Sequence, residues 1–159
     1  MHLLYYRILD PDPEVKYKLY FTVTLVDDDP LYLEQMKDFL QSMKIEDIEC
    51  FRTGEEFLAA VKEGEKRLIV CDFDFGSPNL MNGNDVLDEI RKRNLQMPVI
   101  MLSAQDKLTT AIETLMKGAL DYFFKGTQNT FTSVFTSILK INEIQRMMEE
   151  KDDAGSGNK

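Results

Sequence analysis

Hydrophobic positions along the chain form two kinds of segment, and these alternate. Five short runs are continuously apolar or rich in β-branched and aromatic residues, as in strands that are buried on both faces. They lie at 21–26, 48–51, 68–72, 98–102 and 122–124. Between them, apolar residues recur every three or four positions, which is typical of helices with one buried face. The alternation predicts an α/β fold in which a parallel sheet has helices on both faces.

The same pattern divides the chain into three parts. Residues 20–150 hold the alternating segments and are expected to form one domain. Residues 1–19 form an N-terminal extension, which is either an added edge strand or a flexible arm, because its strand-like beginning is interrupted by Asp-Pro-Asp-Pro. Residues 151–159 are rich in Gly, Ser and Asp and are expected to form a disordered tail.

The last predicted helix, from near Thr130 to about Glu150, is longer than the sheet requires. Its 21 residues would span ~31 Å, against ~17–20 Å for strands of five or six residues. An apolar stripe should cover the sheet and then continue beyond it; its residues are Phe131, Val134, Phe135, Ile138, Ile141, Ile144, Met147 and Met148. We expect the last turns to form a homodimer with a second copy, unless residues 1–20 fold back over them.

Composition narrows the possible partners. The 28 acidic and 19 basic residues give a net charge of −9, which argues against direct nucleic-acid binding by this domain. No apolar run approaches the roughly 18 residues of a membrane span, and no signal-peptide pattern opens the chain, so we expect no membrane contact. Cys50 and Cys71 lie in predicted strands and are interpreted as reduced core thiols, which fits a cytoplasmic protein.

Polar side chains end four of the five predicted strands. Asp27 and Asp28 follow the first strand, Asp72 ends the third, Ser103 ends the fourth and Lys125 ends the fifth. The carboxyl ends of parallel strands share one edge of the sheet, where open α/β sheets place their ligand sites. These five residues are therefore expected to converge, although they are far apart in the sequence.

The residue types at this edge suit phosphoryl chemistry. Three crowded carboxylates repel one another, and a hard divalent cation relieves that repulsion. Oxygen ligands of this kind suit Mg²⁺. Lys125 supplies a positive charge for a phosphoryl oxygen, and Ser103 supplies a hydroxyl donor. Asp72 is then free to act as the nucleophile that forms an acyl phosphate.

Four short motifs at these positions resemble the receiver domain of two-component response regulators. They are Val26-Asp27-Asp28, Ile69-Val70-Cys71-Asp72, Ser103-Ala104, and Asp121-Tyr122-Phe123-Phe124-Lys125 after Gly118-Ala119. The resemblance extends from about Tyr20 to Met148. It implies a flavodoxin-like fold with strand order 2-1-3-4-5, and phosphorylation by a sensor histidine kinase or histidine phosphotransfer protein with Mg²⁺. It implies no enzyme activity beyond self-catalysed phosphoryl transfer and autodephosphorylation.

The resemblance also implies roles for the acidic residues. Asp72 matches the phosphoacceptor of the family. Asp28 matches the direct metal ligand, and Asp27 matches an acid that acts partly through water. The backbone carbonyl of Asp74 matches the remaining protein ligand of the metal.

Three other residues match the phosphate-binding and switching positions of the family. Lys125 matches the phosphate-binding lysine, and Ser103 matches the switch hydroxyl. Tyr122 matches the switch aromatic, while its other interpretation is a core aromatic residue beside Phe123 and Phe124.

The sequence departs from the family pattern in three places. Gly126 stands after the lysine, where the family usually has proline in a cis peptide. Phe75-Gly76 replaces the usual Met-Pro, and the loop that ends in Asn82-Gly83 is longer. These departures motivate an alternative function, a pseudo-receiver that binds its partners without phosphorylation.

A second alternative is a phosphatase of the haloacid-dehalogenase type. Asp72-Phe73-Asp74 resembles the Asp-x-Asp motif of that family, in which the first Asp is the nucleophile and the second is a general acid. Ser103 and Lys125 fit the order of its later motifs. The acidic pair that should come last, however, precedes the nucleophile in this chain.

Overall fold

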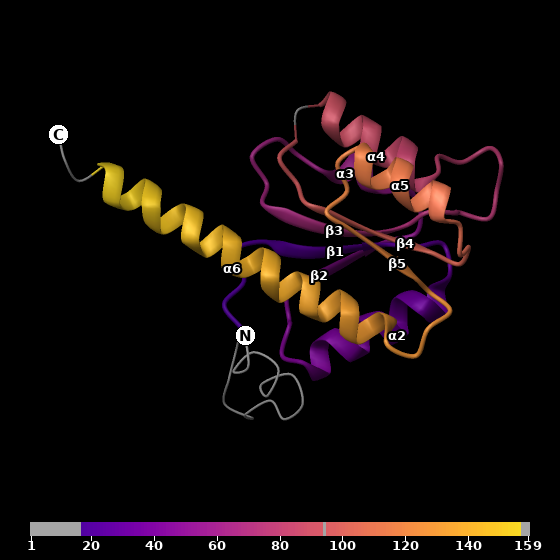
Figure 1. The fold of residues 1–159 in the computed structure, drawn as a ribbon, viewed down its shortest axis with the longest axis horizontal. Helices are drawn as coiled ribbons and strands as arrows, with labels where there is room; N and C mark the ends of the chain where they lie inside the picture. Colours follow the sequence, from indigo (N-terminus) through magenta and orange to yellow (C-terminus); the bar gives the residue numbers. More distant parts are fainter. Residues whose placement is uncertain (1–16, 94, 157–159) are drawn as a thin grey trace.

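Five parallel strands form one sheet, in the order β2-β1-β3-β4-β5, in the computed structural model, which describes residues 17–93 and 95–156 (Figure 1). The strands are β1 (Thr22–Val26), β2 (Ile48–Phe51), β3 (Arg67–Asp72), β4 (Val99–Ser103) and β5 (Asp121–Phe124). The predicted α/β class and the flavodoxin-like strand order are both confirmed.

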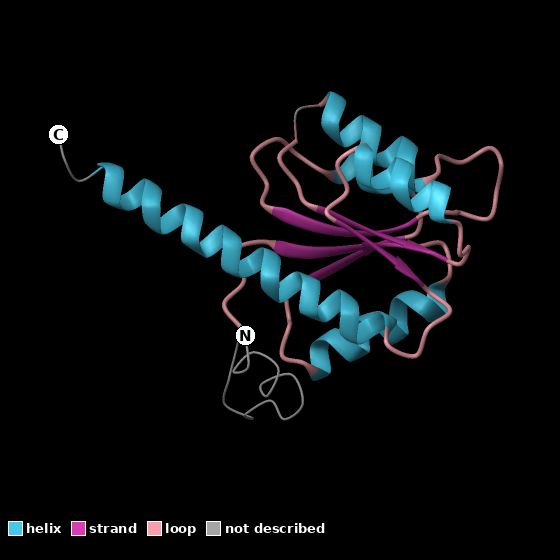
Figure 2. Cartoon of the chain, viewed as in Figure 1, coloured by secondary structure: helices cyan, strands magenta, loops and turns pink. Residues whose placement is uncertain are grey.

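Five described helices connect or follow these strands and cover both faces of the sheet. They are α2 (Pro30–Ser42), α3 (Gly54–Ala60), α4 (Gly83–Lys92), α5 (Leu108–Met116) and α6 (Thr130–Ser156). Helices α2 and α6 lie on one face, and α3, α4 and α5 lie on the other (Figure 2). The site considered below lies at the end of the sheet where each strand leads into the next helix.

Strand β3 shows why its sequence is apolar without alternation. Leu68 and Val70 pack into the core beneath α2 and α6, while Ile69 and Cys71 pack into the core beneath α3 and α4. Side chains of a strand point alternately to its two faces, and both faces of β3 are covered. Between Arg67 at its start and Asp72 at its carboxyl edge, the strand has no charged residue.

Local signals set where two of the helices begin. The side chain of Asp29 accepts hydrogen bonds from the N–H groups of Leu31 and Tyr32, and Pro30 occupies the first helical turn of α2. At α4, Asn82 and Asp85 form a reciprocal capping box. These caps fix the backbone that leaves β1 and the backbone that re-enters the fold after β3.

Helix α6 crosses the sheet and then projects beyond it (Figure 1). Val134, Phe135 and Ile138 are fully buried against the sheet, as predicted. The later apolar residues of the stripe lie on the projecting part, where Ile144, Met147 and Met148 are about half exposed. One helix therefore both closes the core and carries apolar surface into solvent.

The end of α6 corrects one prediction. The helix continues to Ser156, six residues past the expected end near Glu150, so the first part of the predicted disordered tail is helical. Residues 151–154 contain neither glycine nor proline, and nothing in them stops a helix. Residues 157–159 lie outside the described ranges. No helix within those ranges has an apolar stretch long enough to cross a membrane.

The described part of the N-terminal extension lies against α6. Tyr17 packs against an aromatic ring of that helix, with 5.7 Å between the ring centroids. The Asn142 side-chain amide accepts a hydrogen bond from the Tyr20 N–H at 2.9 Å and donates one to the Lys18 carbonyl at 3.0 Å. This part of the extension is not a strand, and the predicted strand-like stretch in residues 1–16 lies outside the described residues.

The two cysteines differ in their surroundings. Both are free thiols in the described part of the chain, and Cys71 is buried as predicted. Cys50 is exposed, so its interpretation as a core residue is wrong. It lies on β2, which is the edge strand beside β1 and is covered less completely than the central strands.

Candidate functional site

The carboxyl edge of the sheet carries the residues that were predicted to converge. Asp27 directly follows β1, Asp72 ends β3, Ser103 ends β4 and Lys125 directly follows β5. The parallel register places Asp27 level with Asp72 on the adjacent strand. The folding of the sheet alone therefore brings these positions to one place.

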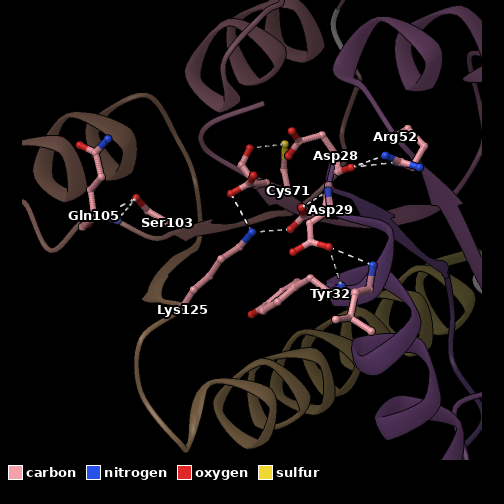
Figure 3. Close-up of polar contacts among 11 residues, drawn as sticks. Asp28, Asp29, Tyr32, Arg52, Cys71, Ser103, Gln105 and Lys125 are labelled. Atoms are coloured by element: carbon pink, nitrogen blue, oxygen red, sulfur yellow. Dashed lines mark hydrogen bonds and ion pairs between the residues drawn. The ribbon is translucent and has the colours of Figure 1, made fainter. Parts of the chain in front are cut away.

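Four of the predicted residues form one charged cluster. Asp27, Asp28 and Asp72 each present a carboxylate oxygen, and these oxygens all lie within 4.8 Å of one another. Lys125 Nζ lies 3.0 Å from Asp72 Oδ1 and donates a hydrogen bond to Asp27 Oδ2 (Figure 3). One ammonium group is therefore shared by two of the three acids.

Burial dominates the electrostatics of the cluster. Burial, together with the negative charge of Asp27, raises the pKa of Asp72 to about 7, although Lys125 opposes the change. Burial also raises the pKa of Asp27, against the hydrogen bond from Lys125. Burial disfavours the charged form of Lys125, but the two carboxylates outweigh it and raise the pKa of that amine. The ammonium therefore stays charged, and the acids remain incompletely neutralised.

The loop that carries Asp27 and Asp28 is held by neighbouring groups. The N–H of Asp29 donates to Asp27 Oδ1 at 3.0 Å. Arg52, which follows β2, donates from both Nε and Nη2 to the backbone carbonyl of Asp28, with Nε at 3.0 Å (Figure 3). Gly76 has φ +65°, and a Cβ at that position would lie 2.8 Å from Asp28 Oδ2. The Asp28 carboxylate therefore needs a residue without a side chain beside it.

Ser103 lies at the same edge, but its hydroxyl forms its hydrogen bonds within its own loop. Ser103 Oγ accepts a hydrogen bond from the backbone N–H of Gln105 at 3.0 Å. The side-chain amide of Gln105 in turn donates to Asp74 Oδ2 at 2.9 Å, which links the loop after β4 to the loop after β3. In this conformation the serine is near the cluster without being part of it.

Tyr122 and Asp74 hold the two remaining predicted positions. Tyr122 is half-buried and packs against the core beneath α3 and α4. Its hydroxyl is buried and has no hydrogen-bond partner within the described ranges. The Asp74 carboxylate is exposed and is not one of the three oxygens that lie together. The role of Tyr122 as a switch and that of the Asp74 carbonyl as a metal ligand stay predictions.

Three residues near the cluster were not predicted. Arg52 could have been found by the rule that identified the others, since it directly follows a strand. Tyr32 lies one helical turn after Asp28, and its ring centroid is 4.3 Å from Lys125 Nζ. A helical pattern gives the spacing of Tyr32 but not which neighbour its ring meets. Gln105 follows Ser103 in an exposed loop and has no sequence signal.

The cluster has the chemistry of a divalent-cation site. Its donors are three carboxylate oxygens, the ligand type that Mg²⁺ prefers. Burial and the charge of Asp27 together raise the pKa of Asp72. A single lysine cannot balance three acids, so a further positive charge would relieve the repulsion among them. The residues present therefore fit a hard metal ion at this edge of the sheet.

Comparison with known protein families agrees with the fold and the site. The family model described as "Response regulator receiver domain" matches residues 23–133 of the chain. The chain belongs to the response regulator receiver family. This membership confirms the resemblance seen in the four sequence motifs. It also shows that the phosphatase alternative, which depended on one Asp-x-Asp motif, was wrong as a family assignment.

Several curated regulatory proteins are similar to this chain. The probable C4-dicarboxylate response regulator DctR of Bacillus subtilis (strain 168) is 34% identical over 104 residues, which are 65% of this chain and 45% of that protein. The transcriptional regulatory protein ZraR of Escherichia coli (strain K12) is 30% identical over 103 residues, which are 65% of this chain and 22% of that protein. This receiver chain thus spans less than half the length of these curated relatives.

A solved receiver domain has the same fold. The receiver domain of the Francisella response regulator 1452 superimposes with a TM-score of 0.69 at 27% identity, over 78% of this chain and 98% of that one. The present receiver differs from the usual pattern after its lysine, where Gly126 is exposed and its peptide bond to Lys125 is trans. A Cβ at residue 126 would meet the ring of Phe124, so the turn favours glycine.

The raised pKa of Asp72 predicts how the stability of this receiver depends on pH. The folded protein holds the Asp72 proton up to about pH 7, whereas the unfolded chain loses it near 3.8. The folded state is therefore increasingly destabilised as the pH rises between these values. In metal-free buffer at pH 8, Asp72→Asn should raise the free energy of unfolding by about 1–3 kcal/mol. At pH 4 the gain should nearly vanish.

Urea unfolding of wild type and variant at both pH values measures this difference. Asp74→Asn is the matched control, because it removes an exposed carboxylate two residues away and should give no pH-dependent gain. An equal gain in the control, or no gain for Asp72→Asn at pH 8, would contradict the conclusion that ionisation of Asp72 destabilises the folded state.

Proposed function

We propose that this receiver domain accepts a phosphoryl group on Asp72 from the phosphohistidine of a sensor histidine kinase or a histidine phosphotransfer protein. The observation that carries the proposal is the 3.0 Å contact between Lys125 Nζ and Asp72 Oδ1 beside two further acids at the carboxyl edge of the sheet. Family membership supports the same conclusion.

The proposed transfer is a displacement at phosphorus. An Asp72 carboxylate oxygen forms a new O–P bond as the N–P bond of the phosphohistidine breaks. The other ring nitrogen carries a proton, and the departing nitrogen keeps the electron pair of the N–P bond, so the histidine leaves as a neutral imidazole. Lys125 offsets the charge of the phosphoryl oxygens. Water later hydrolyses the acyl phosphate to release inorganic phosphate and restore Asp72, so no external substrate is turned over.

Asp72 would work together with a bound Mg²⁺. Asp27, Asp28 and Asp72, with the backbone carbonyl of Asp74, are the proposed protein ligands. Mg²⁺ bound there would neutralise the acids and the phosphoryl oxygens. The pKa of about 7 for Asp72 leaves a large part of this carboxyl ionised, and hence nucleophilic, at neutral pH.

The signal is proposed to leave the site through β4 and α5. The Ser103 hydroxyl can exchange its bond within the loop for a phosphoryl oxygen on Asp72, and Tyr122 on the neighbouring strand can follow it. Helix α5 has its apolar residues outside: Leu108 is 75% exposed and Met116 is 84% exposed. An exposed apolar face of this kind suits a protein partner, and we propose it as the face that phosphorylation switches.

A homodimer through the projecting part of α6 is a further part of the proposal. The described N-terminal residues hydrogen-bond to α6 at Asn142, and they leave Ile144 at 57%, Met147 at 49% and Met148 at 57% exposure. This supports a second copy as the cover, and the proposed dimer is parallel. Arg146, paired with Glu143 and Glu150 of the same helix, would lie beside the apolar contact.

The proposed location is the cytoplasm. Cys50 is an exposed free thiol, and such thiols stay reduced in that compartment. Kinases of two-component systems would meet the domain there.

Acetyl phosphate with Mg²⁺ tests the phosphoacceptor directly. Wild type should gain one phosphoryl group at Asp72, and Asp72→Asn should gain none. Asp28→Ala should lose the dependence on Mg²⁺ together with most of the labelling, because a metal ligand is removed. Intact mass and peptide mapping measure both results. A folded wild type that is never labelled would support the pseudo-receiver function instead.

Asp74 is expected to affect the lifetime of the phosphorylated form more than its yield. Its carboxylate lies two residues past the acceptor, where it can help place the attacking water or repel the phosphoryl group. Asp74→Ala should change the rate of dephosphorylation several-fold, as measured by the loss of labelled protein over time. Gln105→Ala is the matched control, because it frees the Asp74 side chain without removing its charge. Equal lifetimes for Asp74→Ala and wild type would show that this carboxylate has no such role.

Association through α6 is tested by sedimentation. Wild type with beryllofluoride and Mg²⁺, which mimic the phosphorylated form, should dimerise more strongly than wild type alone. Ile144→Glu should stay monomeric because it places a charge in the apolar stripe. Thr132→Glu is the control for charge, because it introduces the same charge at an exposed position near the start of the same helix, away from the proposed contact. A monomer under all conditions at tens of micromolar would contradict the dimer.

A further inference from the structure

Lys125 is held at its backbone, and its long side chain has several rotatable bonds. Its N–H donates to the carbonyl oxygen of Ser103 at 2.8 Å. The next residue is Gly126, which does not restrict the backbone as proline would. A lysine ammonium is a point charge on a flexible four-carbon stem. The position of the Lys125 ammonium therefore depends on the groups that surround it.

Tyr32 supplies the uncharged part of those surroundings. Lys125 Nζ lies over the Tyr32 ring, 4.3 Å from its centroid, which is within the range of cation–π attraction. In Figure 3 the Tyr32 ring lies below the ammonium of Lys125. The contacts of the ammonium with the two carboxylates are on the sides that face away from the ring. The lysine head is thus enclosed by two acids and one aromatic face.

Tyr32 is itself held at its backbone and at its ring. The Tyr32 N–H donates to Asp29 Oδ1 at 3.3 Å, as part of the cap of α2. Phe131 of α6 meets the ring in a T-shaped arrangement, with centroids 5.4 Å apart and an angle of 80°. Phe131 also packs against Phe39, further along α2. Tyr32 therefore connects the lysine to the packing between α2 and α6.

The hydroxyl of Tyr32 does not explain this placement. It is buried and has no hydrogen-bond partner among the residues that the structure describes. A buried hydroxyl without a partner costs stability, whereas the aromatic face has a polar contact in Lys125. Phenylalanine at this position would keep that contact, and leucine would lose it.

We propose that Tyr32 is a positioning residue, which holds the Lys125 ammonium in place for phosphoryl transfer to Asp72. The proposal rests on the proposed function, which assigns Lys125 to the phosphoryl oxygens. Both carboxylates that now hold the ammonium would change partners when a metal ion and a phosphoryl group arrive. The aromatic face would not, so it supplies a constant attraction throughout the transfer.

The rate of labelling by acetyl phosphate and Mg²⁺, measured per folded protein, gives the first test. Tyr32→Phe should stay within about twofold of wild type, and Tyr32→Leu should be about 3- to 30-fold slower. Phe39→Leu is the control, because it removes another ring of the same aromatic cluster and should leave the rate unchanged. If Tyr32→Leu fails to fold, Tyr32→Met serves as the ring-free variant.

A double-mutant cycle separates positioning from a structural effect. In a Lys125→Met background, adding Tyr32→Leu should slow the residual labelling no further, since the group on which Tyr32 acts is absent. An equal slowing in both backgrounds, or a wild-type rate for Tyr32→Leu, would overturn the proposal.

The NMR shift of the Lys125 ε-methylene protons gives a readout that needs no phosphorylation. The ring should shift these protons upfield in wild type and in Tyr32→Phe, and the shift should be lost in Tyr32→Leu. Failure to label wild-type Asp72 would reject the proposed function. If the ε-methylene protons of Lys125 in wild type have the chemical shift of a solvent-exposed lysine, the positioning by Tyr32 is rejected.

Discussion

The sharing of one ammonium group by two buried carboxylates is the interaction on which the site depends. Lys125 contacts both Asp27 and Asp72, and burial raises the pKa of each of these acids. With Asp28 close by, three acids share one cation, so negative charge remains uncompensated. A divalent cation would lower the free energy of this arrangement, and under the proposed function it would also free Lys125 to bind a phosphoryl oxygen.

Carboxylates that repel one another stay together only if the backbone that carries them is rigid. Strand β3 has a neighbouring strand on each side and a helical layer on each face, so Asp72 cannot withdraw from the cluster by local movement. Two glycines then provide the space that the acids require. Gly76 leaves room for the Asp28 carboxylate, and Gly83 lies so close to the backbone oxygen of Asp72 that a Cβ would be 2.8 Å away. The stability of the apolar core therefore offsets the free-energy cost of the charged cluster at its edge.

The fold and the acidic cluster could be predicted from the sequence because both follow from backbone topology. Alternating segments imply a parallel sheet, and a parallel sheet puts Asp27, Asp72 and Lys125 at one edge. The properties that were missed depend on side-chain direction and local cover. The exposure of Cys50 reflects an incompletely covered edge strand, and the contact of Tyr32 with Lys125 joins two elements far apart in the chain. Periodicity contains neither kind of information.

The structure places a short path between the site and the apolar surface of α5. Gln105 contacts the loops after both β3 and β4, because its N–H donates to the Ser103 hydroxyl and its side chain donates to Asp74. A Ser103 hydroxyl that turned toward Asp72 would have to leave Gln105, and α5 begins only a few residues further on, at Leu108. That helix buries a threonine, Thr114, and exposes its apolar residues, so it is held to the sheet less tightly than an ordinary amphipathic helix. Under the proposed role of Ser103 as the switch hydroxyl, α5 is the next helix along the chain and the one whose exposed apolar surface a change in charge at Asp72 would affect first.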